Sequence, residues 1–192
     1  MNILLLGPEC KRIEESVKAS GHGLTRCEEI LSREYLDNNQ FDYGISYRYR
    51  HILKQDIIDW FAGKLINLHI SVLPWNRGAD PNFWSFIENT PKGVTIHKID
   101  IGVDTGDILL QEECEFDVER DTLRSTYQKL SERIESLFIS NMDKLFSGTV
   151  LPVKQVGAGT VHKSSDIQKY IYLIEEKGWD TPVSVLVVNS RG

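Results

Sequence analysis

The stretch KLINLHISVLPWNRG, residues 64–78, decides the fold around it. Its first seven residues form an apolar run that is typical of a buried strand, and alternate residues of a strand lie on one face. Asn67 and His69 are therefore expected on the same face. Pro74 and the turn residues before Gly78 end the regular structure soon after them. The pair is thus predicted at the carboxyl end of a strand, where open α/β sheets bind ligands.

Two downstream segments, GVTIH at 93–97 and DTGD at 104–107, add further polar groups. The amide of Asn67, the imidazole of His69 and the carboxylate of Asp104 suit acyl transfer to an amine. Such a reaction needs a donor for the charge that develops on the acyl oxygen, a group that moves a proton, and a carboxylate that orients it. Any one of these residues alone is more often a core polar group or part of a turn. The three together favour a catalytic site.

The ordered motif Asn-x-His-x-Ser-x-Leu-Pro, the Gly-Val-Thr-Ile-His strand and the Asp-x-Gly turn resemble the folate-dependent formyltransferases, from about Tyr47 to Gln111. The resemblance implies that Asn67, His69 and Asp104 are catalytic and that N10-formyltetrahydrofolate is the formyl donor. It also implies folate contacts along two segments, formed by His51, Ile52 and Leu53, and by Asp100 and Ile101 together with Asp104.

Three acceptors are known for this family: glycinamide ribonucleotide, methionyl-tRNA and amino sugars carried on nucleotides. Enzymes that act on glycinamide ribonucleotide carry a Gly-Ser-rich, phosphate-binding loop after the first strand. This chain has Pro8, which lacks a backbone donor, and Glu9, which repels phosphate. Enzymes that act on methionyl-tRNA carry a further carboxyl-terminal domain, for which we expect too little chain, and the net charge of −6 disfavours nucleic acid.

By elimination, we expect a primary amine on a nucleotide-linked amino sugar, as in lipopolysaccharide biosynthesis and other routes to bacterial surface polysaccharides. Two other classes stay open, a formyltetrahydrofolate hydrolase and a non-catalytic folate-binding protein. Release of formate without an added amine would favour the hydrolase. Folate binding without turnover would favour the binding protein.

Aromatic and basic side chains near the motif are candidates for binding the acceptor. Arginine pairs bidentately with phosphate, and aromatic rings stack on flat bases or sugars. Each of these residues could instead have only a structural role, as a core tryptophan, a solvent-exposed arginine or a strand end with one face in water. The candidates are Tyr47, Arg50, Trp75, Asn76 and Arg77.

Alternating strand and helix patterns predict an α/β fold, a doubly wound and mostly parallel sheet flanked by helices. We expect a catalytic domain at 1–150 and a short extension at 151–192 packed on the same domain. Strands are expected at 3–7, 41–47, 64–70, 93–99 and 107–116, and helices at 11–20, 54–61, 81–88 and 121–146. Asp80 is the expected N-cap of the helix at 81–88. The tail is expected to hold a strand after Gly157, a helix around 166–177 and an apolar end at 183–188.

Composition sets further bounds. With 192 residues, 41% of them hydrophobic, the chain suits one domain. Its three cysteines lack metal-site spacing, so we expect reduced thiols and no metal. The sequence shows no signal peptide and no membrane span, so we expect a cytoplasmic protein without a membrane partner. A homodimer is a further possibility that the sequence does not decide. His97 is either a support for the site or part of the sheet, and His22 and His162 are expected in loops or on the surface.

Overall fold

The computed structural model describes residues 1–189. The strands are β1 (Asn2–Leu6), β2 (Gly23–Cys27), β3 (Tyr43–Ser46), β4 (Leu65–His69), β5 (Arg77–Gly78), β6 (Gly93–Lys98), β7 (Ile108–Glu113) and β8 (Val161–His162). The α-helices are α1 (Lys11–Ala19), α2 (Arg33–Asn39), α3 (Gln55–Trp60), α4 (Pro81–Ile87), α5 (Leu123–Phe146) and α6 (Val183–Asn189). Two 3₁₀ helices, η1 (Asp166–Leu173) and η2 (Gly178–Asp180), lie between β8 and α6.

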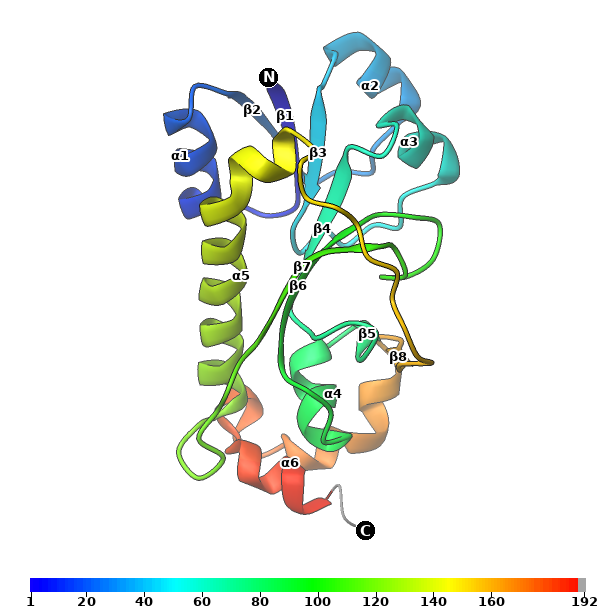
Figure 1. Cartoon of the computed structure of the whole chain (residues 1–192). Coiled ribbons are helices and arrows are strands. Elements are labelled where there is room, and N and C mark those ends of the chain that lie inside the picture. The colour runs from blue at the N-terminus through cyan, green and yellow to red at the C-terminus, as the bar shows by residue number, and fades with distance from the viewer. Residues whose placement is uncertain (190–192) are drawn as a thin grey trace.

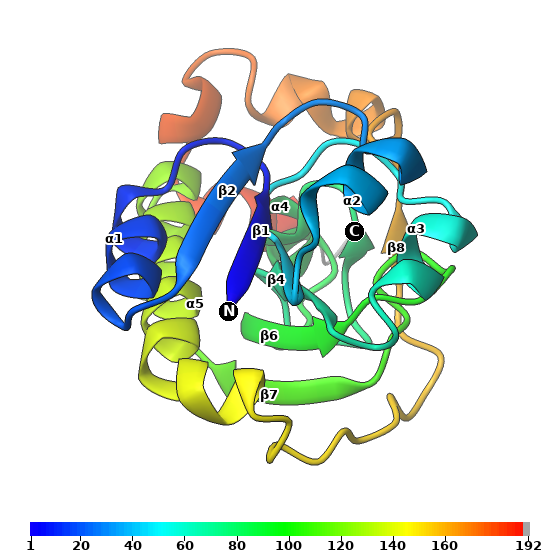
Figure 2. The same cartoon turned by 90° about the horizontal axis from the view of Figure 1, so that it is seen from above.

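The central sheet has the strand order β2-β1-β3-β4-β6-β7 (Figure 1). The pairs β1–β2, β1–β3 and β3–β4 are parallel, whereas β6 is antiparallel to both β4 and β7. Seen from above, α1 and α5 lie on one side of the sheet, and α2 and α3 lie on the other (Figure 2). This arrangement confirms the predicted α/β class with a mostly parallel sheet flanked by helices.

Strand β1 shows why the sheet is covered on both faces. Ile3 and Leu5 pack into the cluster formed with α1 and α5, and Leu4 and Leu6 pack into the cluster formed with α2 and α3. All four side chains are at most 1% exposed. A strand that is buried on both faces reads as a continuous apolar run, as residues 3–6 do.

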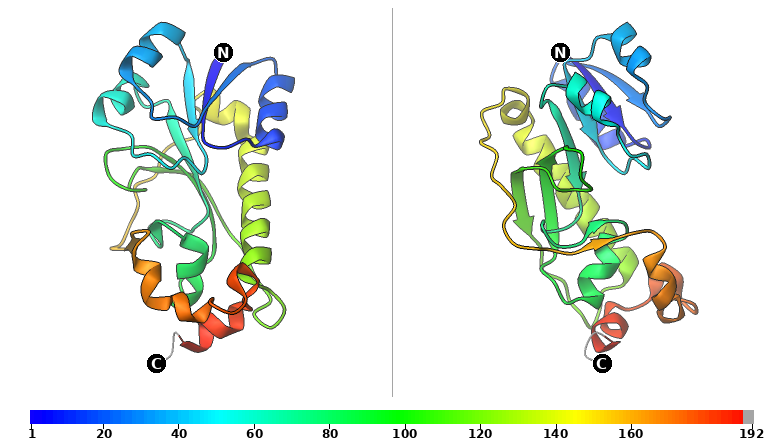
Figure 3. Two further views of the ribbon diagram at one scale, coloured as in Figure 1. Left: turned by 180° about the vertical axis from the view of Figure 1, so that it is seen from behind. Right: turned by 90° about the vertical axis from the view of Figure 1, so that its right-hand side faces the viewer.

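The chain after α5 returns along the molecule and closes its lower end, as two further views show (Figure 3). The loop that follows β4 carries the end of the sequence motif and is called the motif loop below. Strand β5 lies in this loop and pairs with β8, with Gly78 opposite His162. Val183 and Leu186 of α6 share a buried cluster with Phe83 and Phe86 of α4. Within residues 1–189, no helix is both long enough and apolar enough to cross a membrane.

Some expected elements differ from the structure. The pattern did not predict β2, an edge strand with few buried side chains, or α2, in which Leu36 is the buried residue. The tail helix expected at 166–177 is the shorter 3₁₀ helix η1, and the apolar end forms α6. Asp80 occupies the N-cap of α4, but it lies in the left-handed region at φ 52°, and its side chain accepts no capping hydrogen bond.

Candidate active site

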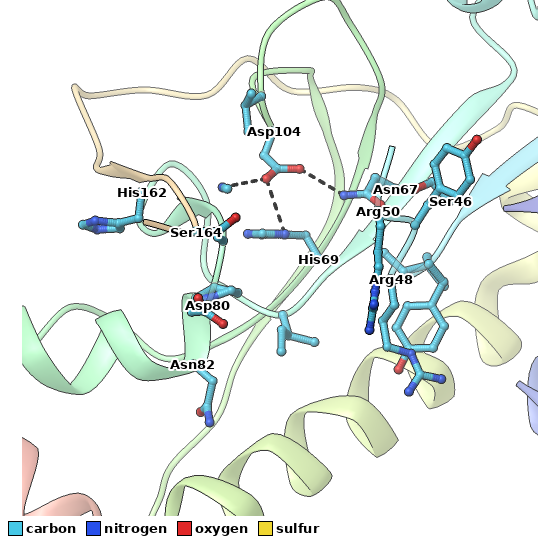
Figure 4. Close-up of a pocket in the computed structure, with 18 of the residues that line it drawn as sticks. Ser46, Arg48, Arg50, Asn67, His69, Asp80, Asn82, Asp104, His162 and Ser164 are labelled. Atoms are coloured by element: carbon cyan, nitrogen blue, oxygen red, sulfur yellow. Dashed lines mark hydrogen bonds and ion pairs between the residues drawn. The ribbon is translucent and has the colours of Figure 1, made fainter. Parts of the chain in front are cut away.

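The structure brings Asn67, His69 and Asp104 together. Asn67 and His69 lie on β4, and Asp104 lies in the loop between β6 and β7. The amide Nδ2 of Asn67 donates to Asp104 Oδ1 at 3.0 Å, and His69 Nδ1 lies 3.6 Å from Asp104 Oδ2 (Figure 4). The backbone N–H of Gly78 donates to the same Oδ2 at 2.8 Å. The carboxylate therefore links the β4 face to the motif loop.

The contacts of His69 distinguish its two ring nitrogens. Nε2 lies 3.1 Å from the backbone carbonyl oxygen of Asn76. A carbonyl oxygen only accepts hydrogen bonds, so Nε2 is the nitrogen that carries a proton in the neutral ring. Nδ1 then holds the lone pair and faces Asp104. The imidazole can take up a proton at Nδ1, and the resulting N–H can donate a hydrogen bond to the Asp104 carboxylate, which stays ionised.

His97 also belongs to this site, although its role was open from sequence. It lies directly opposite Asn67 in the antiparallel pair of β4 and β6. Its Nδ1 donates to the carbonyl of Lys98 at 2.8 Å, and its Nε2 lies 3.3 Å from both Asn67 Nδ2 and Asp104 Oδ1. Cross-strand neighbours approach closely enough for such contacts. His97 thus supports both the amide and the carboxylate.

The environment keeps Asp104 ionised. Burial by itself would raise the pKa of this carboxyl group. The neighbouring rings of His69 and His97 and the backbone N–H of Gly78 outweigh burial and hold the pKa of Asp104 well below its usual range. A fixed negative charge therefore sits beside the imidazole of His69.

A cleft of about 1150 Å³ opens above these groups. Every candidate folate-contacting residue and two candidate acceptor-binding residues lie in its wall. They are His51, Ile52, Leu53, Asp100, Ile101 and Asp104, with Tyr47 and Arg50. Within residues 1–189, no group of three His, Cys, Asp or Glu side chains is placed to hold a metal ion.

Three candidate acceptor residues do not lie in the cleft wall. Trp75 is 37% exposed elsewhere on the surface. Asn76 is fully buried, and its side chain bonds to Glu88, Thr90 and Thr160. Arg77 donates to Gln155 Oε1 from Nε at 3.1 Å and from Nη2 at 2.7 Å. Residues near β4 in sequence can thus lie outside the cleft wall. A role of these three in acceptor binding stays a prediction.

Other cleft residues were not selected from sequence. Arg48 lines the cleft, and the alternation of basic and aromatic residues in the segment YRYRH at 47–51 could have identified it as a binding residue. Other cleft residues lie on α5 and in the tail, where the sequence carried no such signal; they include Arg124, Tyr127, His162, Lys163, Ser164 and Trp179. The expectation that His162 is a surface residue is wrong, because its ring stacks on Trp84 at a centroid distance of 4.0 Å and its side chain is 11% exposed.

Comparisons with known proteins agree with this geometry. The formyl transferase family model matches residues 22–142. The methionyl-tRNA formyltransferase of Lachnospira eligens is 34% identical over 144 residues, which cover 72% of this chain and 45% of that protein. That of Thermodesulfovibrio yellowstonii is 38% identical over 117 residues, which cover 60% of this chain and 38% of that protein. The chain thus spans less than half the length of these curated relatives.

Solved structures give a fuller match. The formyltransferase PseJ of Anoxybacillus kamchatkensis, in complex with UDP-4,6-dideoxy-4-formamido-L-AltNAc and tetrahydrofolate, is similar at a TM-score of 0.94 and 45% identity. The match covers 99% of this chain and 100% of that chain. A 4-N formyltransferase of Francisella tularensis shares the fold at a TM-score of 0.77 and 19% identity, over 98% of this chain and 87% of that one. The chain belongs to the formyl transferase family.

Proposed function

We propose that this protein transfers a formyl group from N10-formyltetrahydrofolate to the primary amine of a nucleotide-linked amino sugar. The observation that carries the proposal is the meeting of three polar side chains at the cleft, where Asn67 lies 3.0 Å and His69 lies 3.6 Å from the carboxylate of Asp104. This set supplies a donor for a developing oxyanion, a proton acceptor and a fixed negative charge.

The cleft wall fits a folate. Ile52 is 85% exposed and Ile101 is 65% exposed, and both line the cleft. Apolar side chains exposed at a cleft can pack against the flat faces of the rings of a folate. His51 and Leu53 lie beside the first of them, and Asp100 lies beside the second. When bound, the donor supplies a formyl group on a nitrogen that can leave.

Each residue of the site has a distinct task in the proposed reaction. Asn67 Nδ2 uses one hydrogen for Asp104 and points the other at His97 over 3.3 Å, a long bond that it can exchange for a charged formyl oxygen. As the amine nitrogen bonds to the formyl carbon, Nδ1 of His69 takes the amine proton. Asp104 stabilises the resulting imidazolium. His69 Nδ1 would then return this proton to the folate nitrogen as the bond from that nitrogen to the formyl carbon breaks, which restores the neutral ring.

The acceptor assignment is supported by the 45% identity to PseJ, whose structure holds a UDP-linked formamido sugar. The chain also offers cations for a diphosphate, because Arg48 and Arg50 line the cleft. The guanidinium of Arg48 lies 4.5 Å over the Tyr47 ring, and no ion pair joins either arginine to a carboxylate within residues 1–189. Arg48 also lies in the left-handed region at φ 58°, a strained conformation for a non-glycine residue that is often found at binding sites.

The decisive experiment compares acceptors under one buffer condition. The purified protein is given N10-formyltetrahydrofolate with a UDP-linked 4-amino sugar, the free amino sugar, glycinamide ribonucleotide or methionyl-tRNA. We expect the nucleotide-linked sugar to give a kcat/KM at least about 100-fold above that of the free sugar, because the remote nucleotide helps to hold the reacting geometry.

Two controls separate the alternatives. A reaction without any amine measures formate release, and a rate equal to that with the amine would identify a hydrolase instead. A preference for methionyl-tRNA or glycinamide ribonucleotide would leave formyl transfer intact and remove the sugar assignment. Folate binding without turnover on any acceptor would make the chain a binding protein.

A further inference from the structure

The turn that holds His69 in place is built around Asn76. This residue is fully buried and lies in the left-handed region at φ 55°. Asparagine tolerates this conformation better than most residues. The conformation presents its backbone carbonyl to His69 Nε2 at 3.1 Å. The orientation of the catalytic imidazole therefore depends on the orientation of one peptide group.

All the polar atoms of Asn76 are bonded within the protein. Oδ1 accepts from the hydroxyl of Thr90 at 2.7 Å, and Nδ2 donates to Glu88 Oε2 at 3.2 Å. The backbone N–H donates to Thr160 Oγ1 at 2.9 Å. Three partners from α4, the following loop and the tail thus fix the side chain and the amide while the carbonyl is left for His69.

Glu88 also lies beside the tail. Its other carboxylate oxygen, Oε1, lies 3.1 Å from Nε2 of His162. The His162 ring stacks on Trp84 of the same helix with an angle of 9° between the planes. In Figure 4, His162 lies on the opposite side of His69 from Arg48. The path from β8 to the imidazole is therefore His162, Glu88, Asn76, His69.

We infer that Glu88 and Thr160 are positioning residues for the proposed reaction, because they orient the Asn76 carbonyl and so set the proton of His69 on Nε2. With Nε2 protonated, Nδ1 carries the lone pair and lies 3.6 Å from Asp104 Oδ2. That carboxylate by itself favours a proton on Nδ1, so the tautomer depends on the bond from Nε2 to the Asn76 carbonyl. The opposite tautomer would place the proton on Nδ1 and leave no lone pair there to take the amine proton. Partners that orient a catalytic ring are known to affect activity strongly when they are removed. The inference rests on the proposed function for its kinetic consequence only.

The direct test reads the tautomer of His69 without any substrate. Protein with ¹⁵N-labelled histidine is measured at a pH where the rings are neutral, and the His69 signal among the five histidines is assigned with His69→Ala. The native protein is expected to show a protonated Nε2 and an unprotonated Nδ1. Asn76→Gly, which keeps the left-handed backbone, and Thr160→Val, which removes only the hydroxyl, should move both shifts towards the average of two tautomers. Thr160→Ser should restore the native shifts.

The kinetic test uses the same variants and Glu88→Ala. We expect kcat to fall about 10-fold or more, with the KM of both substrates nearly unchanged, because a misplaced catalytic group loses rate rather than binding. Ser85→Ala is the matched control, since it removes a buried hydroxyl of α4 that bonds within the helix, to the Asn82 carbonyl at 2.9 Å. Its kcat should stay near the native value.

Native tautomer and native kcat in folded Thr160→Val and Glu88→Ala would overturn the inference. A parallel rise in KM would also overturn it, because the turn would then serve binding. If the native protein transfers no formyl group, the proposed function fails, but the ¹⁵N measurement still decides whether these residues set the tautomer.

Discussion

The candidate catalytic centre and the part of the cleft wall formed by Arg48 and Arg50, here called the arginine wall, are organised in opposite ways. In the centre, the side chains of His69, His97 and Asp104 are 8%, 2% and 13% exposed, and their polar atoms contact protein partners. On the wall, Arg48 and Arg50 line the cleft without a carboxylate partner within the described part of the chain. The polar groups of the centre are therefore already bonded within the protein. The two arginines carry positive charges that a ligand can neutralise.

This difference indicates where each region should act. Fixed donors and a fixed carboxylate stabilise charge that appears only during reaction, so their loss should appear in kcat. Unpaired cations bind charge that is already present on the acceptor, so their loss should appear in KM. Substitutions in the two regions can therefore be separated by steady-state kinetics.

The largest effect is expected for His69→Ala. The variant loses the group that takes the amine proton, and kcat should fall by about 100-fold or more. Both KM values should change little, and thermal unfolding should show an intact fold. Near-normal turnover of the purified variant would remove His69 from the mechanism and abolish the contrast between the two regions.

A smaller effect is expected for Arg48→Ala. Loss of a charged hydrogen bond to phosphate should raise the KM of the nucleotide-linked acceptor about 10-fold, while kcat and the KM of the folate change little. Arg33→Ala is the control, because Arg33 pairs with Asp37 on α2 and does not line the cleft. A raised folate KM with an unchanged acceptor KM would assign Arg48 to the cofactor instead.

The charge of Asp104 should also appear in the stability of the fold at low pH. Because its pKa is lower in the folded protein than in the unfolded chain, it stabilises the fold fully above the unfolded value of about 3.9 and loses this contribution as the pH falls towards the folded value. The difference in Tm between the native protein and Asp104→Asn should therefore narrow from pH 5 to pH 2. A constant difference over this range would contradict the lowered pKa.

The smallest effect is expected for Arg77→Ala. Its guanidinium bonds to Gln155 rather than lining the cleft, so its loss should lower the free energy of unfolding by about 1 kcal/mol and leave the acceptor KM unchanged. Chemical denaturation and steady-state kinetics measure the two quantities. An increase in the acceptor KM as large as that of Arg48→Ala would instead assign diphosphate binding to Arg77.

Local patterns predicted much of the sheet. The apolar runs that became β1, β3 and β4 were correctly placed because a strand buried on both faces needs apolar side chains throughout. The alternation of Asn67 and His69 likewise predicted a shared face, and the structure turns both to Asp104. Strand β2 gave no such signal, because an edge strand with exposed side chains is fitted by many polar sequences.

The sequence by itself determined the α/β class and the shared face of Asn67 and His69, since both follow from short-range period and spacing. The resemblance of its motif to the formyltransferases added Asp104 as the third polar residue of the site. Only the tertiary structure decided that Arg77 faces Gln155, that Asn76 is a buried turn residue, and that Thr160 and His162 reach the motif loop. These contacts join residues 78 to 84 positions apart. Their pairing depends on how the tail packs against α4, which no local pattern encodes.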